Sequence, residues 1–309
     1  MTAKALTKKI GIDLGNGSMK FVGGESVDKL KFACIPSLAT TDSDDNNHVI
    51  IIGEEKVHFG VGDPLIEQDK TKRKYIGHSL LLAIYEIYGT GKHEISVGLT
   101  LPINLYKITK ETFRTSMEQY RTLEGTVNGE EVKVTFHKIE VYAEGLNAFI
   151  ALASEIEKED IAFIDLGHRT TDVILANSVT ENGKKKWKLV DNDSFQVGGY
   201  DLLNILKGAL YEPTNGTLFE VHQIEHYLTG NGMIGAVRIK DYFPSCNNAI
   251  EELIRKMGNR FNDLHHRKIY LVGGASPIFE SVCGLANVVC FEHAHQRIYS
   301  NAVGSYMKL

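Results

Sequence analysis

The chain has 309 residues, of which 43% are hydrophobic and 24% are charged, a composition typical of globular proteins that fold in water. This length is sufficient for two domains or one large domain. The net charge of −5 argues against a protein that binds nucleic acid along its whole surface, because such proteins usually carry excess positive charge.

The sequence shows no pattern typical of a membrane or secreted protein. No apolar run approaches the ~18 residues of a membrane span, and the start "MTAKALTKKIGID" lacks the apolar core and cleavage site of a signal peptide. The four cysteines, Cys34, Cys246, Cys283 and Cys290, show no paired spacing. We therefore expect a reduced, cytoplasmic protein without membrane contact.

Strand-like and helix-like segments alternate along the chain, as in α/β proteins. In the first half we predict strands at 10–13, 20–24, 29–39, 49–53 and 94–102, a helix around 79–88, a hairpin over 126–142 and a helix over 143–157. Asn128 and Gly129 supply the positive φ angles that a two-residue hairpin turn requires. We expect the acidic segment 40–48 to be a loop. The basic cluster Lys70–Lys74 is expected to be a solvated lead-in to a helix rather than a site for an acidic partner.

The charged stretch around residue 158 predicts a boundary between two halves. Beyond it we expect a strand that closes at Asp165, a strand at 173–180 with a hairpin turn at 182–183, strand–glycine turn–helix units over 195–210 and 268–282, and a helix over 247–261. Segment 212–244 is less regular and is expected to combine helix and loops. Ser276 resembles an N-cap, with Pro277 at the first helical position.

Two segments repeat almost the same pattern, "IGIDLGNGSMKFV" at 10–22 and "IAFIDLGHRTTDVIL" at 161–175. Each has an apolar strand, a closing aspartate, Leu-Gly, a small polar turn and a hydroxyl residue before apolar residues resume. In this alignment Asp13 corresponds to Asp165, Gly15 to Gly167, and Ser18 to Thr170. The pattern indicates a duplicated α/β unit.

The chemistry of the first turn suits a polyphosphate. A glycine-containing turn after a strand presents several backbone N–H groups to one point, and glycines let an anion approach the backbone closely. Ser18 adds a hydroxyl donor and Lys20 an ammonium on the same face. Asp13 would repel a bare phosphate, which predicts a bound cation such as Mg²⁺. The alternative for each single turn is an ordinary tight connection after a buried strand.

The second turn, 167–171, would form a matching cradle with Asp165 as its carboxylate. Two further glycine turns, at 197–203 and 272–274, each lead from a strand into a helix, whose N-terminus can approach a nucleotide. One such turn alone is mostly a packing solution. Four glycine turns in this order indicate a nucleotide site.

These motifs, together with "IYLVGGASPIF" at 269–279, resemble the superfamily of actin, DnaK-type chaperones and sugar kinases, and most of all its ParM-like branch of plasmid-partition proteins. The resemblance implies an α/β, actin-like fold: a duplicated ribonuclease-H-like pair of domains with a nucleotide cleft between them. One domain would comprise 1–157 plus 295–309, with a smaller subdomain at roughly 31–95. The other would comprise 158–294.

The resemblance also implies roles for individual residues. Asp13 and Asp165 would organise hydrated Mg²⁺, and Glu144 would polarise the attacking water. The alternative role of Glu144 is that of an acidic residue favoured at a helix N-terminus by the helix dipole. Nucleotide contacts would come from Gly15, Asn16, Gly17, Ser18, Lys20, Gly167, His168, Arg169, Thr170, Gly198, Gly199, Asp201, Gly273, Gly274 and Ala275.

Two positions depart from the family pattern. His168 stands where the superfamily usually has glycine, which puts the closest backbone approach in question. Arg169 is either a phosphate ligand or a surface ion-pair partner. Ribose and adenine contacts between Tyr200 and Lys240 do not align with the family.

By resemblance, the chain is an ATPase that binds ATP and Mg²⁺, forms filaments of its own copies and segregates plasmid DNA through a DNA-bound adaptor, without sequence-specific DNA contact of its own. Alternatives are an ATP-dependent small-molecule kinase and a non-partition cytoskeletal filament. A chaperone is not expected, because the sequence offers no peptide-binding module after Leu309.

Overall fold

The computed structural model describes residues 8–44, 48–67, 69–291 and 293–309. Residues 45–47 of the predicted acidic loop therefore lie outside the described residues. The chain divides into two compact units, one formed by the segment up to Ala153 together with Tyr299–Leu309, the other by Ser154–Ile298. Each unit has its own hydrophobic core.

One large sheet forms the framework of the first unit. Its strands among the described residues run in the order β3-β2-β1-β8-β10-β9-β5-β6-β4-β7. Their bounds are β1 Lys8–Leu14, β2 Ser18–Gly24, β3 Leu30–Pro36, β4 Leu38–Thr40, β5 Val49–Ile52, β6 Glu55–Phe59, β7 Asp63–Pro64, β8 Gly91–Leu101, β9 Thr122–Val127 and β10 Glu130–Ala143. β1, β8 and β10 are parallel neighbours, and the other ladders are antiparallel.

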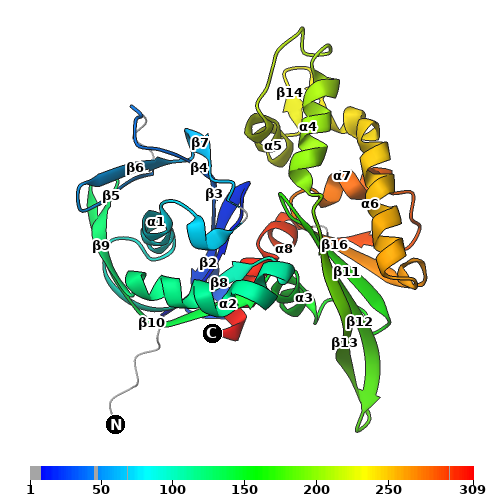
Figure 1. The fold of residues 1–309 in the computed structure, drawn as a ribbon, viewed down its shortest axis with the longest axis horizontal. Coiled ribbons are helices and arrows are strands. Elements are labelled where there is room, and N and C mark those ends of the chain that lie inside the picture. The colour runs from blue at the N-terminus through cyan, green and yellow to red at the C-terminus, as the bar shows by residue number, and fades with distance from the viewer. Residues whose placement is uncertain (1–7, 45–47, 68, 292) are drawn as a thin grey trace. The chain divides into compact units, whose positions relative to one another are not determined.

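Helix α1 (Ile76–Tyr88) lies inside the curve of this sheet, which passes around it in Figure 1. Most of its residues are buried, including the run Leu80–Ile84, because an apolar helix with no polar face needs cover on every side. The unit also contains α2 (Ile103–Met117), α3 (Leu146–Leu152), α9 (Ser300–Lys308) and the 3-10 helices Val27–Lys29, Lys70–Lys72 and Glu118–Tyr120.

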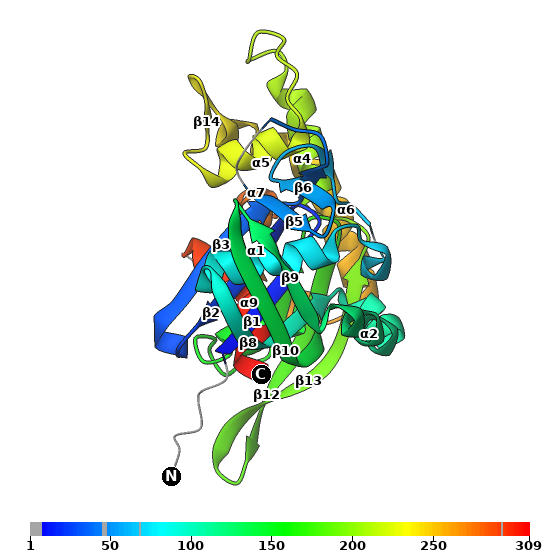
Figure 2. The same ribbon diagram turned by 90° about the vertical axis from the view of Figure 1, so that its left-hand side faces the viewer.

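The C-terminal helix α9 packs on β1 and α3 at backbone distance, and Figure 2 shows it beside β1. Two glycines make this approach possible. A Cβ added at Gly11 would lie 1.9 Å from the carbonyl oxygen of Ala302, and one at Gly304 would lie 2.1 Å from that of Asn147. Larger residues at either position would push the helix away.

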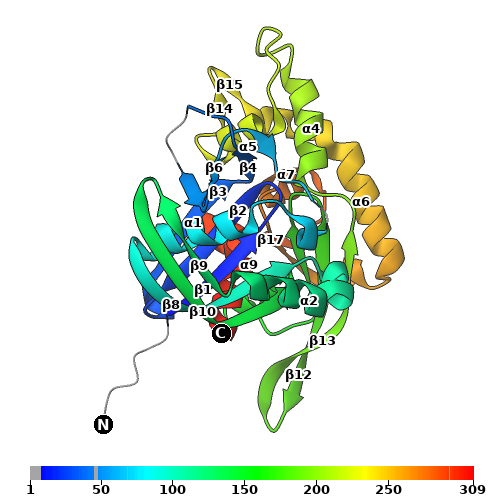
Figure 3. The ribbon, with the colours of Figure 1, turned by 60° about the vertical axis from the view of Figure 1, so that its left-hand side comes forward.

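The second unit has a sheet in the order β13-β12-β11-β16-β17. Its strands are β11 Ile161–Leu166, β12 Thr171–Glu181, β13 Lys184–Phe195, β16 Lys268–Val272 and β17 Val288–Cys290, with a separate ribbon of β14 Met233–Ile234 and β15 Val237–Arg238. The helices are α4 Gly199–Leu210, α5 Val221–Thr229, α6 Asn247–Arg260, α7 Ser276–Val282 and α8 Ala294–Ile298, with 3-10 helices Ile239–Cys246 and Leu264–His266. The β12–β13 hairpin extends beyond the sheet (Figure 3).

Five strands of each unit share one topology. In both, an antiparallel β-meander of three strands is followed by two parallel strands: β3-β2-β1-β8-β10 in the first unit and β13-β12-β11-β16-β17 in the second. This confirms the duplicated α/β fold. Both predicted hairpin turns are also present, with positive φ at Asn128-Gly129 and Asn182-Gly183.

Two predicted elements differ in the structure, and one observed helix was not predicted. The helix expected over 143–157 is shorter, because β10 continues to Ala143 and α3 covers only Leu146–Leu152. The residue before helix α7 is Ala275, so Ser276 is not its N-cap: the Ser276 hydroxyl donates to the Gly273 carbonyl at 2.8 Å instead. Helix α2 was not expected. Among the helices of the described residues, none is long and apolar enough to span a bilayer.

Candidate nucleotide site

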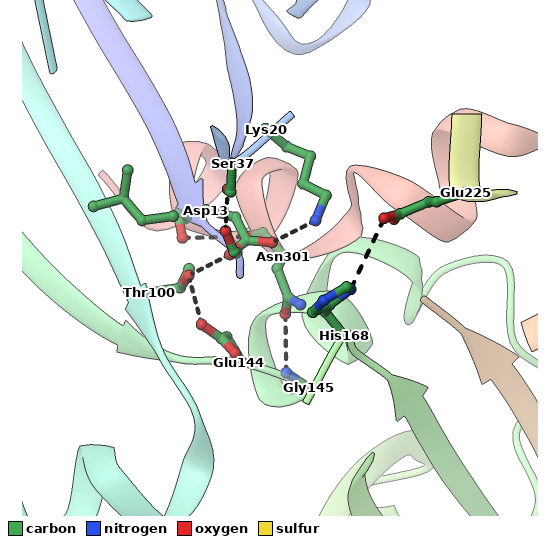
Figure 4. Close-up of polar contacts among 12 residues, drawn as sticks. Asp13, Lys20, Ser37, Thr100, Glu144, Gly145, His168, Glu225 and Asn301 are labelled. Atoms are coloured by element: carbon green, nitrogen blue, oxygen red, sulfur yellow. Dashed lines mark hydrogen bonds and ion pairs between the residues drawn. The ribbon is translucent and has the colours of Figure 1, made fainter. Parts of the chain in front are cut away.

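The first repeated turn connects β1 to β2 and places Asp13 at the end of a buried strand. Asp13 is 6% exposed and lies opposite Lys20 in the β1–β2 ladder. Lys20 Nζ lies 3.7 Å from Asp13 Oδ2 (Figure 4). The alternation of the strands therefore sets an ammonium beside the carboxylate at the base of the turn.

The turn itself is tightly packed. A Cβ added at Gly15 would lie 2.6 Å from the Ser18 carbonyl oxygen and 2.9 Å from Lys20 Nζ, so only glycine fits. The backbone N–H of Ser37 donates to the Gly17 carbonyl at 2.9 Å. Asn16 Oδ1 is buried and has no hydrogen-bond partner among the described residues. A buried polar atom of this kind is one that a bound molecule can satisfy.

Glu144 lies next to Asp13, on the turn between β10 and α3. The Thr100 hydroxyl reaches Glu144 Oε1 at 3.1 Å and Asp13 Oδ1 at 3.2 Å (Figure 4). A hydroxyl has one proton, so it can serve only one of these two carboxylates at a time. The structure thus brings together two of the three predicted catalytic residues.

Lys70 was missed by the sequence prediction and lies between these two acids. Its side chain is 3% exposed, and its Nζ lies 2.5 Å from Glu144 Oε1 and 3.9 Å from Asp13 Oδ1. Burial raises the pKa of Glu144 above its ordinary value, and Asp13 adds to that rise, while Lys70 opposes it. The ammonium, together with the hydroxyl of Thr100, therefore favours the ionised form of Glu144.

Arg73, from the same basic cluster, is also buried. Its Nη1 donates to the carbonyls of Leu14 and Gly15 at 2.9 and 3.3 Å, and its Nη2 donates to Ser37 Oγ at 3.1 Å. Burial lowers the pKa of Arg73 to about 10, so it stays charged at neutral pH. The expectation that segment 70–74 is solvated is therefore wrong for Lys70 and Arg73, whose buried side chains bind groups of the site. Lys72 and Lys74 are exposed.

The second repeated turn connects β11 to β12 in the second unit. Asp165 is the penultimate residue of β11 and is 5% exposed. Asp13 has the same place in β1 and is 6% exposed. Its neighbour across the ladder is Asp172, also buried, in the place that Lys20 takes in the first unit. Two carboxylates opposite each other on antiparallel strands repel, so this end of the sheet favours a nearby cation.

The start of helix α4 packs on this second turn. The N–H groups of Gly199 and Tyr200 donate to the carbonyls of Gly167 and His168, each at 2.8 Å. A Cβ at Gly198 would lie 2.6 Å from the His168 carbonyl oxygen, so the approach requires glycine. Asp201 accepts from the Gly198 N–H at 2.9 Å and thereby caps the helix.

His168 and Arg169 both contact α4. The His168 ring lies 5.4 Å from that of Tyr200, and its Nδ1 is 3.9 Å from Glu225 Oε2. The Arg169 guanidinium lies over the Tyr200 ring at 4.0 Å, and its buried Nε has no hydrogen-bond partner among the described residues. This cation–π stacking is a contact that the sequence analysis did not predict.

The glycine turn before α7 lies beside the second repeated turn. Gly273 has φ +91°, and a Cβ there would lie 2.2 Å from the Leu166 carbonyl oxygen. Ala275 is buried at the start of α7, and a Cβ added at Gly199 would lie 3.1 Å from its side chain. Gly274 is exposed and has open space around it. In the second unit, the structure therefore gathers three of the predicted glycine turns around the end of β11.

Asp13 and Asp165, the predicted metal residues, belong to different units of the chain. Within the described ranges, no group of three or more His, Cys, Asp or Glu side chains is arranged to hold an ion. An ion bound through water and substrate oxygens needs fewer protein ligands than a structural site.

Comparison with known proteins shows which proteins this chain resembles. Residues 11–146 match the family model described as "Actin like proteins N terminal domain". No curated protein sequence matches the chain. Among solved structures, the 15-stranded ParM filament from Clostridium botulinum covers 98% of both chains with a TM-score of 0.71 and 16% identity.

Two other solved structures are similar over nearly the whole chain. An archaeal actin homolog in complex with ADP has a TM-score of 0.71 and 19% identity over 97% of this chain and 98% of its own. The filament of AlfA from B. subtilis plasmid pLS32 has a TM-score of 0.61 and 18% identity over 98% and 99%. The chain therefore has the two-domain α/β fold of the actin-like proteins. The resemblance to this family, ParM included, is confirmed.

Proposed function

We propose that this protein is an ATPase that assembles into filaments with ATP and Mg²⁺ bound, loses them after hydrolysis, and segregates plasmid DNA through a DNA-bound adaptor in the cytoplasm. The observation that carries the proposal is the buried group of Asp13, Lys70 and Glu144 beside a glycine turn, in a chain with an actin-like fold. The ParM and AlfA structures are filaments by their titles, and the archaeal homolog binds ADP.

The residues present fit a nucleotide with its metal ion. The Gly15 position has no room for a side chain and lies against an ammonium, as a phosphate cradle requires, and Asn16 keeps a buried polar atom for a ligand. Asp13 and Asp165 would hold Mg²⁺ through its water molecules. The ion would supply charge neutralisation at the phosphates. The remaining nucleotide contacts are proposed as the sequence predicts them.

Glu144 would act as the general base for hydrolysis. A water molecule attacks the γ-phosphorus, its proton passes to a Glu144 oxygen, and ADP leaves as the bond from the γ-phosphorus to the bridging oxygen breaks. Such assistance is typically worth ~10²–10⁴-fold in rate. It requires the ionised carboxylate, which Lys70 stabilises at 2.5 Å.

Sedimentation tests assembly, and phosphate release tests hydrolysis. With ATP and Mg²⁺ we expect the protein to pellet and to release phosphate without any added metabolite, which a small-molecule kinase would need. With ADP it should stay in the supernatant. Protein that remains soluble at high concentration with every nucleotide would refute the filament proposal. Phosphate release only after a metabolite is added would favour the kinase.

A further inference from the structure

The backbone directly after Glu144 has an unusual conformation. Gly145 has φ +64° and ψ −55°, and the N–H of Leu146 donates to the Glu144 carbonyl at 2.6 Å. These values describe a γ-turn with positive φ, a rare and strained conformation that glycine adopts most easily. Such strain persists only where surrounding contacts hold it, and it concentrates at functional sites.

The contact that holds this turn comes from the C-terminal helix. Asn301 Oδ1 accepts a hydrogen bond from the Gly145 N–H at 2.9 Å, in a buried position (Figure 4). The N–H of Glu144 donates to the Leu101 carbonyl at 2.8 Å on the other side. The backbone of Glu144 is thus fixed between β8 and α9, independently of its carboxylate contacts.

Helix α9 is anchored firmly enough to act as this support. Asn147 Nδ2 donates to Ser305 Oγ at 2.7 Å, one turn further along α9. A Cβ at Gly304 would lie 2.1 Å from the Asn147 carbonyl oxygen, so the two helices meet at backbone distance. The amide of Asn301 therefore has little freedom to move relative to the turn.

We propose that Asn301 is a positioning residue for Glu144: it keeps the strained Gly145 turn closed and so aims the carboxylate at the attacking water. This inference rests on the proposed function. Without the acceptor oxygen, the turn would relax toward an ordinary backbone conformation and the carboxylate would leave its contacts with Thr100 and Lys70. Nucleotide binding would change little, since Gly145, which Asn301 holds, lies outside both repeated turns.

The test compares Asn301→Ala with Tyr306→Phe, which removes the hydrogen bond from the Tyr306 hydroxyl to the Gly24 carbonyl on the same helix, away from the Gly145 turn. We expect Asn301→Ala to lower the maximal rate of phosphate release about tenfold, with ATP affinity within twofold of the wild type, because base assistance is worth ~10²–10⁴-fold. Tyr306→Phe should stay within twofold in both. In a Glu144→Ala background, Asn301→Ala should cause no further loss. Equal losses for Asn301→Ala and Tyr306→Phe, or the same loss in both backgrounds, would overturn the inference.

Amide hydrogen exchange at Gly145 tests the contact without any activity. Exchange should be slow in the wild type and in Asn301→Asp, which keeps an acceptor oxygen, and at least tenfold faster in Asn301→Ala. Slow exchange in Asn301→Ala would overturn the inference, as would fast exchange in Asn301→Asp. If the wild type releases no phosphate, the proposed function fails while this measurement still decides whether Asn301 holds the turn.

Discussion

Replacing Lys70 by methionine should reveal how much the buried ammonium contributes to stability. The substitution keeps most of the side-chain volume but leaves Glu144 and Asp13 buried together without the cation between them. Removing one partner of a buried ion pair typically costs ~3–5 kcal/mol. The Glu144 side chain is 14% exposed, so we expect the lower end, about 3 kcal/mol at pH 8.

This loss should depend on pH, and the direction follows from linkage. Without Lys70, the pKa of folded Glu144 rises further above its ordinary 4.5. A raised carboxyl pKa leaves stability intact below the unfolded value and removes it as pH rises through the folded value. The destabilisation of Lys70→Met should therefore be small at pH 4.5 and grow by pH 7–8.

Urea unfolding at several pH values measures this effect, with Lys72→Met as the control. Lys72 lies in the same 3-10 helix, but its side chain is 79% exposed and pairs with Asp69 at the surface. Its loss should stay within about 0.5 kcal/mol at every pH. If both variants lose the same stability, or if the loss in Lys70→Met does not shrink in acid, the ammonium does not hold these carboxylates as described.

Three further predictions concern the base and the second repeated turn. Glu144→Ala should lower phosphate release at least tenfold while pelleting with ATP persists; unchanged release would assign the base elsewhere. Because burial raises the pKa of Glu144 and the base must be ionised, the maximal rate should begin to fall on acidification at a pH above 4.5; a rate that stays constant down to pH 4.5 would contradict this. Gly198→Ala should cost ~1–3 kcal/mol in urea unfolding, since its Cβ would lie 2.6 Å from the His168 carbonyl oxygen. Its control, Gly208→Ala, has open space inside α4 and should stabilise by up to ~1 kcal/mol; equal effects of the two changes would refute the packing argument.

Local patterns predicted the parts of the fold that local chemistry determines. Asn128-Gly129 and Asn182-Gly183 identify hairpin turns because few other residues adopt their positive φ angles. The repeated strand–Asp–Leu–Gly pattern identified two equivalent strand ends, and the paired sheets confirm them. The predicted limits of α3 were wrong because the apolar spacing of a helix does not indicate where the preceding strand ends.

The interior of the site depends on contacts that no local pattern contains. Lys70 and Arg73 stand in a run of basic residues that is typical of a solvated surface, yet their partners lie far away in the sequence, at Glu144 and at Leu14. The γ-turn at Gly145 likewise depends on Asn301, at the other end of the chain. A single sequence carries no signal for such pairs, since burial of a charge follows from the tertiary fold.

The two copies of the strand pair, β1–β2 and β11–β12, do not carry the same charges at equivalent positions. In one copy, the acid that ends the first strand faces a lysine of the neighbouring strand; in the other copy, Asp165 faces a second acid, Asp172. The same geometry therefore has two electrostatic characters, one with an acid facing a base and one with two acids facing each other. Exchanging the facing residues, with Lys20→Asp in one hairpin and Asp172→Lys in the other, would exchange those characters while leaving both backbones as they are.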